Sequence, residues 1–297
     1  MPLRIFLTGA TGVIGRRAVP ALMQQGHNIT TPVRNAEKRA ALTGRGVNAI
    51  ACDLFDPAAL RRAVQGHQVV INLVTSIPKG ARALLPWAWK ENTRIRKEVS
   101  ANLSAAAQGT GVERLIQESF APIYPDKGDR WIDETVPLKP VAYNRTVVDA
   151  ERAAAQFGEK GTAVVLRFAY FHGPSDQFTE TVIRSVKRGW LPMPGEPDAY
   201  VSLVAHDDAA RAVVAAMDIP AGVYNVVEKE PRTRRQLGEH IAAALGVKPP
   251  RVMPAWISRL MGSAGEMLGR SERISNRKLE ETGRWRAQVT DLVTRTG

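Results

Sequence analysis

The stretch Thr8-Gly9-Ala10-Thr11-Gly12-Val13-Ile14-Gly15 joins a short apolar run, Leu3–Thr8, to a segment of helical character that begins near Val13. Its three glycines have the spacing of a loop between a strand and a helix. The first permits a tight turn, the second lets backbone amides approach a pyrophosphate, and the third lets the helix pack closely on the strand. The amides of the first helical turn then face the phosphates. This order of elements predicts a dinucleotide-binding site, and a purely structural turn is the alternative.

Apolar runs of strand length alternate with helical stretches over the first 170 residues. The expected strands are Leu3–Thr8, Asn28–Val33, Val47–Ala51, Val69–Val74, Arg114–Glu118 and Thr162–Arg167. The expected helices are Val13–Gln25, Glu37–Leu42, Pro57–Val64, Trp89–Gln108 and Val141–Phe157. Buried runs that alternate with helices are typical of a parallel sheet with helices on both faces.

We therefore predict an α/β fold with a doubly wound parallel sheet of the Rossmann type and a small C-terminal mixed α/β lobe. Residues 1–170 form the dinucleotide-binding domain, and residues 201–227 return to it. Residues 171–200 and 228–297 form the substrate lobe, where proline and glycine interrupt the regular alternation.

Composition narrows the class of protein. The chain has 297 residues, of which 44% are hydrophobic and 24% charged, which is ordinary globular composition. Cys52 is the single cysteine, so an internal disulfide is excluded and a structural zinc site is not expected. No apolar run approaches the ~18 residues of a membrane-spanning helix, and the N-terminus lacks the pattern of a signal peptide. We expect a cytoplasmic protein that binds no metal and no membrane.

The net charge of +12 is concentrated at the two ends of the chain. Residues 1–50 carry seven basic residues and one acidic residue, and residues 228–297 carry fourteen and eight. The C-terminal charges are scattered and accompany no nucleic-acid-binding motif, so we expect no nucleic-acid partner. The N-terminal excess of positive charge lies beside the glycine loop, where we expect it to contact the cofactor.

Arg34 stands at the end of the second expected strand, where an NAD-specific site usually has a carboxylate for the ribose 2′-hydroxyl. A guanidinium there favours a 2′-phosphate instead. With Lys38, Arg39 or Arg16 as a second cation, Arg34 predicts NADP as the cofactor and NAD as the second choice. Lys38 and Arg39 on a solvated helix face are the alternative.

Further residues complete the expected cofactor site. Asp53 follows the third strand and can accept a hydrogen bond from the adenine amino group, while Leu54 packs on the ring. The end of the fourth strand supplies Asn72 and Val74 at the switch point of the sheet. The full set of expected cofactor residues is Thr8, Gly9, Thr11, Gly12, Val13, Ile14, Gly15, Arg34, Asp53, Leu54, Asn72 and Val74.

The chain resembles the extended and atypical short-chain dehydrogenase/reductases, a family that includes NAD-dependent epimerases and dehydratases. The matching segments are Thr8–Gly15 (TGxxGxxG), Asp53-Leu54, Asn102–Val112, Arg167–Pro174, Val204–Ala212 (hVdDva.A) and Gly222–Val226 (G.yNv). The resemblance covers nearly the whole chain and implies a Rossmann fold, a nicotinamide cofactor and a small-molecule substrate. It also makes a homodimer a candidate assembly.

The catalytic positions depart from the family pattern. The family couples a Ser or Thr with a Tyr and with a Lys four residues after the Tyr, and the Lys lowers the pKa of the Tyr. Here Tyr143 stands at the place of the tyrosine, but Val147 replaces the lysine. Alignment on Tyr124 puts Phe120 at the usual serine position, with Ser119 one residue early.

Three interpretations of the catalytic positions stay open. Tyr143 is the general acid and Ser119 orients the substrate oxygen, or Glu118 or Tyr124 transfers the proton, or the site binds cofactor without turnover. We expect an NADP-dependent oxidoreductase or epimerase/dehydratase-like enzyme that acts on a carbonyl or secondary alcohol of a small organic or sugar-nucleotide-like substrate. The alternative is a non-catalytic NADP-binding redox sensor or regulatory protein.

Overall fold

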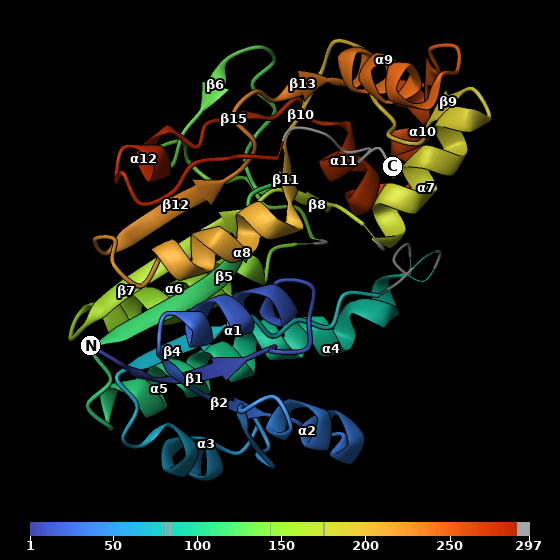
Figure 1. The fold of residues 1–297 in the computed structure, drawn as a ribbon. Helices are drawn as coiled ribbons and strands as arrows, with labels where there is room; N and C mark the ends of the chain where they lie inside the picture. Colours follow the sequence, from blue (N-terminus) through green and yellow to red (C-terminus); the bar gives the residue numbers. More distant parts are fainter. Residues whose placement is uncertain (79, 81, 83–84, 143, 175, 290–297) are drawn as a thin grey trace.

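A computed structural model describes residues 1–78, 80, 82, 85–142, 144–174 and 176–289. At its centre lies a seven-stranded sheet in the order β12-β7-β5-β4-β1-β2-β3, and every pair in it is parallel (Figure 1). The strands are β1 (Arg4–Thr8), β2 (Asn28–Pro32), β3 (Asn48–Ile50), β4 (Val69–Asn72), β5 (Arg114–Phe120), β7 (Thr162–Phe168) and β12 (Gly222–Val226). The strand order reverses between β1 and β4, and the crevice at their carboxyl ends is where such a sheet binds ligands.

Helices cover both faces of the sheet, as Figure 1 shows. On one face α1 (Gly15–Gln24) packs beside α8 (His206–Ala215). On the other face α5 (Ser100–Gln108) packs between α3 (Pro57–Val64) and α6 (Val147–Gly158). Successive strand residues supply the two cores, because Leu7 belongs to the cluster under α1 and α8 and Phe6 to the cluster under α3 and α5. The predicted doubly wound α/β fold is confirmed.

Local sequence patterns predicted the bounds of some helices closely and the bounds of others less well. Helix α3 spans the expected residues, because Asp56 accepts hydrogen bonds from the amides of Ala58 and Ala59. Helix α6 begins at Val147, so the expectation that it begins near Val141 was wrong. The side chain of Asn144 accepts a hydrogen bond from the amide of Val141 and donates one to the carbonyl of Pro122, which holds this segment in turns.

The long helix expected over Trp89–Gln108 is a composite. It comprises a 3-10 turn, η2 (Pro86–Trp89), then α4 (Lys90–Arg94), a π-helical turn over Ile95–Val99, and α5. A π turn inserted in an α-helix is rare and frequently marks a functional site. This turn borders the crevice at the end of β4.

A third buried cluster forms the core of a separate lobe. It lies between α7 (Gln177–Lys187) and α9 (Arg234–Leu245) and includes Val182, Leu191 and Ile241. The remaining helices are α2 (Ala36–Thr43), α10 (Ala255–Leu260), α11 (Gly262–Gly269) and α12 (Arg277–Glu280). The paired short strands are β8 (Tyr170–His172) with β11 (Leu203–Ala205), β6 (Trp131–Ile132) with β15 (Arg273–Ile274), β9 (Trp190–Leu191) with β14 (Arg251–Val252), and β10 (Tyr200–Val201) with β13 (Arg232–Thr233).

The end of the described chain returns to the main core. The carboxylate of Asp208 on α8 accepts hydrogen bonds from the amides of Gln288 and Val289, and its carbonyl accepts one from the indole of Trp285. Trp285 is buried in the same cluster as α1 and α8. The division into a nucleotide domain and a substrate lobe stays a prediction. In the part of the chain that is described, no helix has the length and apolar character to cross a membrane.

Candidate cofactor and active site

The glycine loop closes tightly against the end of β4. The amide of Gly12 donates a 2.9 Å hydrogen bond to the carbonyl oxygen of Gly9, which has a φ of +79°. A Cβ at Gly9 would lie 2.6 Å from the backbone carbonyl of Leu73, and a Cβ at Gly15 would collide with the carbonyl of Gly9. Glycine is therefore required at both positions for the loop to pass this close to β4.

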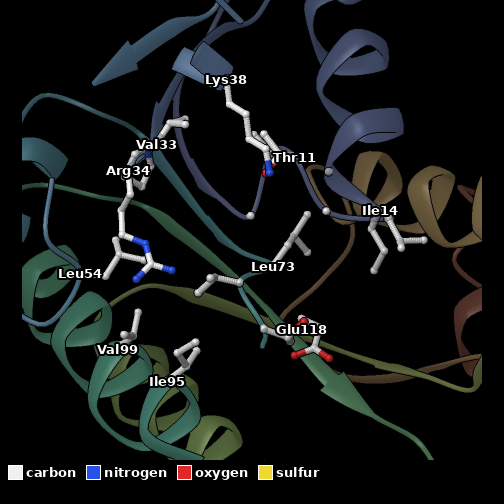
Figure 2. A pocket seen from close by; sticks show the side chains of 18 of the residues that line it. Thr11, Ile14, Val33, Arg34, Lys38, Leu54, Leu73, Ile95, Val99 and Glu118 are labelled. Atoms are coloured by element: carbon white, nitrogen blue, oxygen red, sulfur yellow. The ribbon is translucent and has the colours of Figure 1, made fainter. Parts of the chain in front are cut away.

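A cavity of about 400 Å³ opens in front of this loop. Its walls are the glycine loop, the ends of β2, β3, β4 and β5, the first turns after η2, and Phe171. Figure 2 shows Arg34 and Lys38 toward one part of the cavity and Glu118 toward another, with Leu73 between them. The glycine loop and a buried carboxyl therefore share one cavity.

Most of the residues expected to bind cofactor line this cavity. Those that do are Gly9, Thr11, Gly12, Val13, Ile14, Gly15, Arg34, Asp53, Leu54 and Val74. Thr8 and Asn72 lie beneath the loop instead, fully buried, where the hydroxyl of Thr8 donates to the amide oxygen of Asn72 at 2.6 Å. The amide nitrogen of Asn72 in turn donates to Gln117 at 2.9 Å. This pair ties the ends of β1, β4 and β5 together below the cavity.

The cations that follow β2 make no ion pair with the residues that the structure describes. Arg34 and Lys38 line the cavity from exposed positions. Asn35 begins α2 by accepting a hydrogen bond from the amide of Lys38. Arg16 faces a second hollow between α1 and α2, which Lys38 also borders. Arg39 lines neither hollow.

At the other part of the cavity, Glu118 presents a carboxyl from β5. Its side chain is 9% exposed, and Oε1 lies 3.7 Å from Nη2 of Arg96, which is equally buried. Burial raises the pKa of Glu118, the guanidinium of Arg96 lowers it, and the carboxylate of Glu151 raises it. A buried acid with a raised pKa can carry a proton near neutral pH.

Ser119 and Tyr124 belong to a polar network outside the cavity lining. The hydroxyl of Ser119 donates to Oε1 of Glu151 at 2.5 Å, and Arg167 holds both oxygens of Glu151 at 2.6 and 2.8 Å. Arg167 also donates to the hydroxyl of Tyr124, which donates to Asn225. Tyr124 is fully buried, and this burial raises its pKa to about 12. Neither hydroxyl borders the cavity.

The other positions of the family triad offer no donor where they are described. Phe120 stands at the usual serine position, and its ring packs edge-on against Tyr170 at 5.5 Å. Val147, at the place of the lysine, is fully buried in the first turn of α6. Tyr143 lies outside the described residues.

Sequence reasoning missed two charged residues beside this site, Arg96 and Glu151. Each sits among other charged residues in a helical stretch, a pattern typical of a solvated face. Both are largely buried because Glu118 and Arg167, which are distant in sequence, provide their partners. A weak signal existed for Arg167, since the resemblance singled out the segment that it begins.

Comparison with known proteins agrees with this geometry. A sequence model of the NAD dependent epimerase/dehydratase family matches residues 5–226. The chain belongs to this family. It is 35% identical over 274 residues to a 3-diazoavenalumate denitrifying reductase of a Streptomyces species, covering 88% of each protein. It is 26% identical to a 2-alkyl-3-oxoalkanoate reductase of Stenotrophomonas maltophilia, covering 84% of this chain and 77% of that one.

Solved structures of the family share the fold. A human epimerase family protein with NADPH superposes with a TM-score of 0.79 at 19% identity, covering 98% of this chain and 96% of that one. A UDP-glucose 4-epimerase of Thermus thermophilus with NAD superposes with a TM-score of 0.76 at 22% identity, with the same coverage. The predicted NAD(P)-dependent enzyme of the short-chain dehydrogenase type, an oxidoreductase or epimerase, is thereby confirmed at the level of the family.

Proposed function

We propose that the protein is an NADPH-dependent reductase of a small organic electrophile and that Glu118 supplies the proton of the reduction. The observation that carries the proposal is the position of Glu118, a buried carboxyl that lines the same cavity as the glycine loop. Burial raises the pKa of Glu118 and so favours its protonated form, which can donate to an oxygen that gains charge.

The described residues fit a dinucleotide. The cradle leaves no room for a side chain at Gly9 or Gly15, a Cβ at Gly12 would lie 3.2 Å from the carbonyl oxygen of Gly9, and the first turn of α1 follows directly. Arg34 and Lys38 line the cavity and would hold the 2′-phosphate, and Asp53 and Leu54, which line it too, would hold the adenine. A reduced nicotinamide bound there supplies a hydride to an electrophilic atom of the substrate.

Glu118 then handles the proton that must accompany the hydride. For a carbonyl substrate the hydride adds to carbon, and the carboxyl of Glu118 releases its proton to the oxygen. With the hydride taken from the reduced nicotinamide, the substrate would end as an alcohol, and the carboxylate of Glu118 would recover its proton from solvent. Ile95, Val99 and Leu73 line the cavity with apolar surface that limits water around this acid.

The choice of reduction over epimerisation rests on the relatives of known function. A relative at 35% identity is named as a 3-diazoavenalumate denitrifying reductase, and others are named as a 2-alkyl-3-oxoalkanoate reductase and a ceramide reductase. We therefore propose carbonyl and diazo groups on small organic molecules as the first substrates to assay, ahead of sugar nucleotides.

One observation favours a second function, a non-catalytic NADPH-binding sensor. Val147 is fully buried where the family has its lysine, so a tyrosine at position 143 would lack that cation. A sensor binds NADPH with the same selectivity but transfers no hydride.

The test is a paired titration with NADPH and NADH, followed by a substrate screen with the better ligand and with three variants. Selective NADPH binding and oxidation of NADPH with a carbonyl or diazo compound support the reductase. Glu118→Gln then loses turnover but keeps NADPH affinity, whereas Glu113→Gln, an exposed acid just before β5, behaves as wild type. Loss of turnover in Tyr143→Phe with an unaffected Glu118→Gln would assign the proton to Tyr143 instead.

A further inference from the structure

Two largely buried charges of opposite sign lie on helical segments near Glu118: Arg96, 3.7 Å from its carboxyl, and Glu151, which accepts a hydrogen bond from the adjacent Ser119. We infer that Arg96 and Glu151 are a pair of opposed positioning residues, which together decide the pH range over which Glu118 can deliver a proton. This inference rests on the proposed role of Glu118.

Arg96 belongs to the π-helical turn Ile95–Val99. Ile95 and Val99 line the cavity, while Arg96 is 6% exposed and directs Nη2 to within 3.7 Å of Oε1 of Glu118. This separation is too long for a strong hydrogen bond, so Arg96 acts on Glu118 as a nearby positive charge. The π-helical turn therefore contributes both apolar residues of the cavity wall and the arginine that lies beside Glu118.

Glu151 opposes Arg96 from helix α6. Its carboxylate is fixed by the fork of Arg167, at 2.6 and 2.8 Å, and by the hydroxyl of Ser119, the neighbour of Glu118 in β5. Three hydrogen bonds from two strands leave this charge little freedom to move. Its effect on Glu118 is therefore a built-in property of the fold.

Each of these groups shifts the pKa of Glu118 in a definite direction. Burial and Glu151 favour the protonated form of Glu118, whereas Arg96 favours the carboxylate. Among the described residues, Arg96 and Glu151 are the charged groups that shift the pKa of Glu118, and Arg167 pairs with Glu151. Removing Arg96 should raise the pKa of Glu118. Neutralising Glu151 should lower it, and the Arg167 guanidinium left unpaired would act in the same direction.

The experiment compares Arg96→Met and Glu151→Gln by two readouts. The first is titration of the apoprotein carrying ¹³C-labelled glutamate carboxyls, with the Glu118 resonance identified by its loss in Glu118→Gln. The second is the pH dependence of turnover in the holoenzyme. We expect the midpoint to move up by about one pH unit in Arg96→Met and down by about one in Glu151→Gln.

Two matched changes control for the substitutions themselves. Arg152→Met alters an exposed charge on α6, the helix of Glu151, and Glu159→Gln alters one directly after α6. Both changes should leave the NMR midpoint and the turnover midpoint in place. Loss of packing alone would admit water to Glu118 and lower the midpoint in both variants, so opposite shifts identify the electrostatic role.

The outcomes separate this inference from the proposed function. If Glu118→Gln stops turnover but both test variants titrate like wild type, or both move in the same direction, the inference fails and the proton donor stands. If Glu118→Gln leaves turnover intact, the proposed donor fails, and the NMR midpoints still decide whether Arg96 and Glu151 oppose each other at Glu118.

Discussion

The hydroxyl of Ser119 donates a 2.5 Å hydrogen bond to Oε1 of Glu151, the same oxygen that Nε of Arg167 holds at 2.8 Å. A serine that donates its single proton to a buried ion pair has none left for a substrate oxygen. Glu118, its neighbour in β5, lines the cavity instead. Two adjacent residues of β5 therefore differ in role: the hydroxyl of Ser119 is structural, and the carboxyl of Glu118 is the candidate acid.

The same network predicts the consequence of removing the hydroxyl of Tyr124. Tyr124→Phe leaves Nη1 of Arg167 and the amide oxygen of Asn225 without this buried partner. We expect a loss of about 1–3 kcal/mol in the free energy of unfolding, measured by urea denaturation. The pH dependence of turnover should keep its wild-type midpoint. Intact stability combined with lost turnover would make Tyr124 a proton donor after all.

The close approach of the glycine loop to β4 predicts a sharp contrast between two glycines. Gly9→Ala places a Cβ 2.6 Å from the Leu73 carbonyl at a φ of +79°, so we expect the loop to move and NADPH binding to be lost. Gly26→Ala has nearly the same backbone cost, at a φ of +86°, but meets no atom within 4 Å. It should lose about 1–2 kcal/mol of stability and keep its NADPH affinity. Fluorescence titration and thermal unfolding of both variants provide the measurement, and equal NADPH affinities would contradict the expectation.

We propose that cofactor choice depends on Arg34, whose guanidinium makes no ion pair with the described residues. Arg34→Ala should weaken NADPH binding by about 10- to 100-fold, because a hydrogen-bonded charge is worth about 1.5–3 kcal/mol. NADH affinity should stay unchanged, since it carries no 2′-phosphate. Arg62→Ala, an exposed arginine on α3, is the matched control. Equal losses for NADPH and NADH would place Arg34 elsewhere than at the 2′-phosphate.

The parts that could be predicted from the sequence are those fixed by nearby residues. The turn at Gly9 is closed by the hydrogen bond from the amide of Gly12, and α3 begins at Pro57 because Asp56 caps it. Both depend on residues a few positions apart, so the local sequence predicts them. The late start of α6 depends on the bond from Asn144 to Pro122, 22 residues away. The burial of Arg96 and Glu151 depends on partners 22 and 16 residues distant, respectively, and no local pattern distinguishes them from solvated helix charges.

Glu272 predicts a pH dependence of stability that is separate from the active site. It is buried beside β15, its Oε1 has no hydrogen-bond partner, and burial raises its pKa to about 8. The folded state then binds a proton that the unfolded state has lost, so the free energy of unfolding falls as pH rises from about 4.5 to about 8. The slope should reach about 1.4 kcal/mol per pH unit where one proton separates the states.

Glu272→Gln mimics the protonated form of Glu272, so it should flatten this slope and gain stability at pH 8. Glu281→Gln, on the surface, should retain the wild-type slope. Urea denaturation at pH 5, 6.5 and 8 measures this, and parallel curves for wild type and Glu272→Gln would show that Glu272 keeps an ordinary pKa in the folded protein.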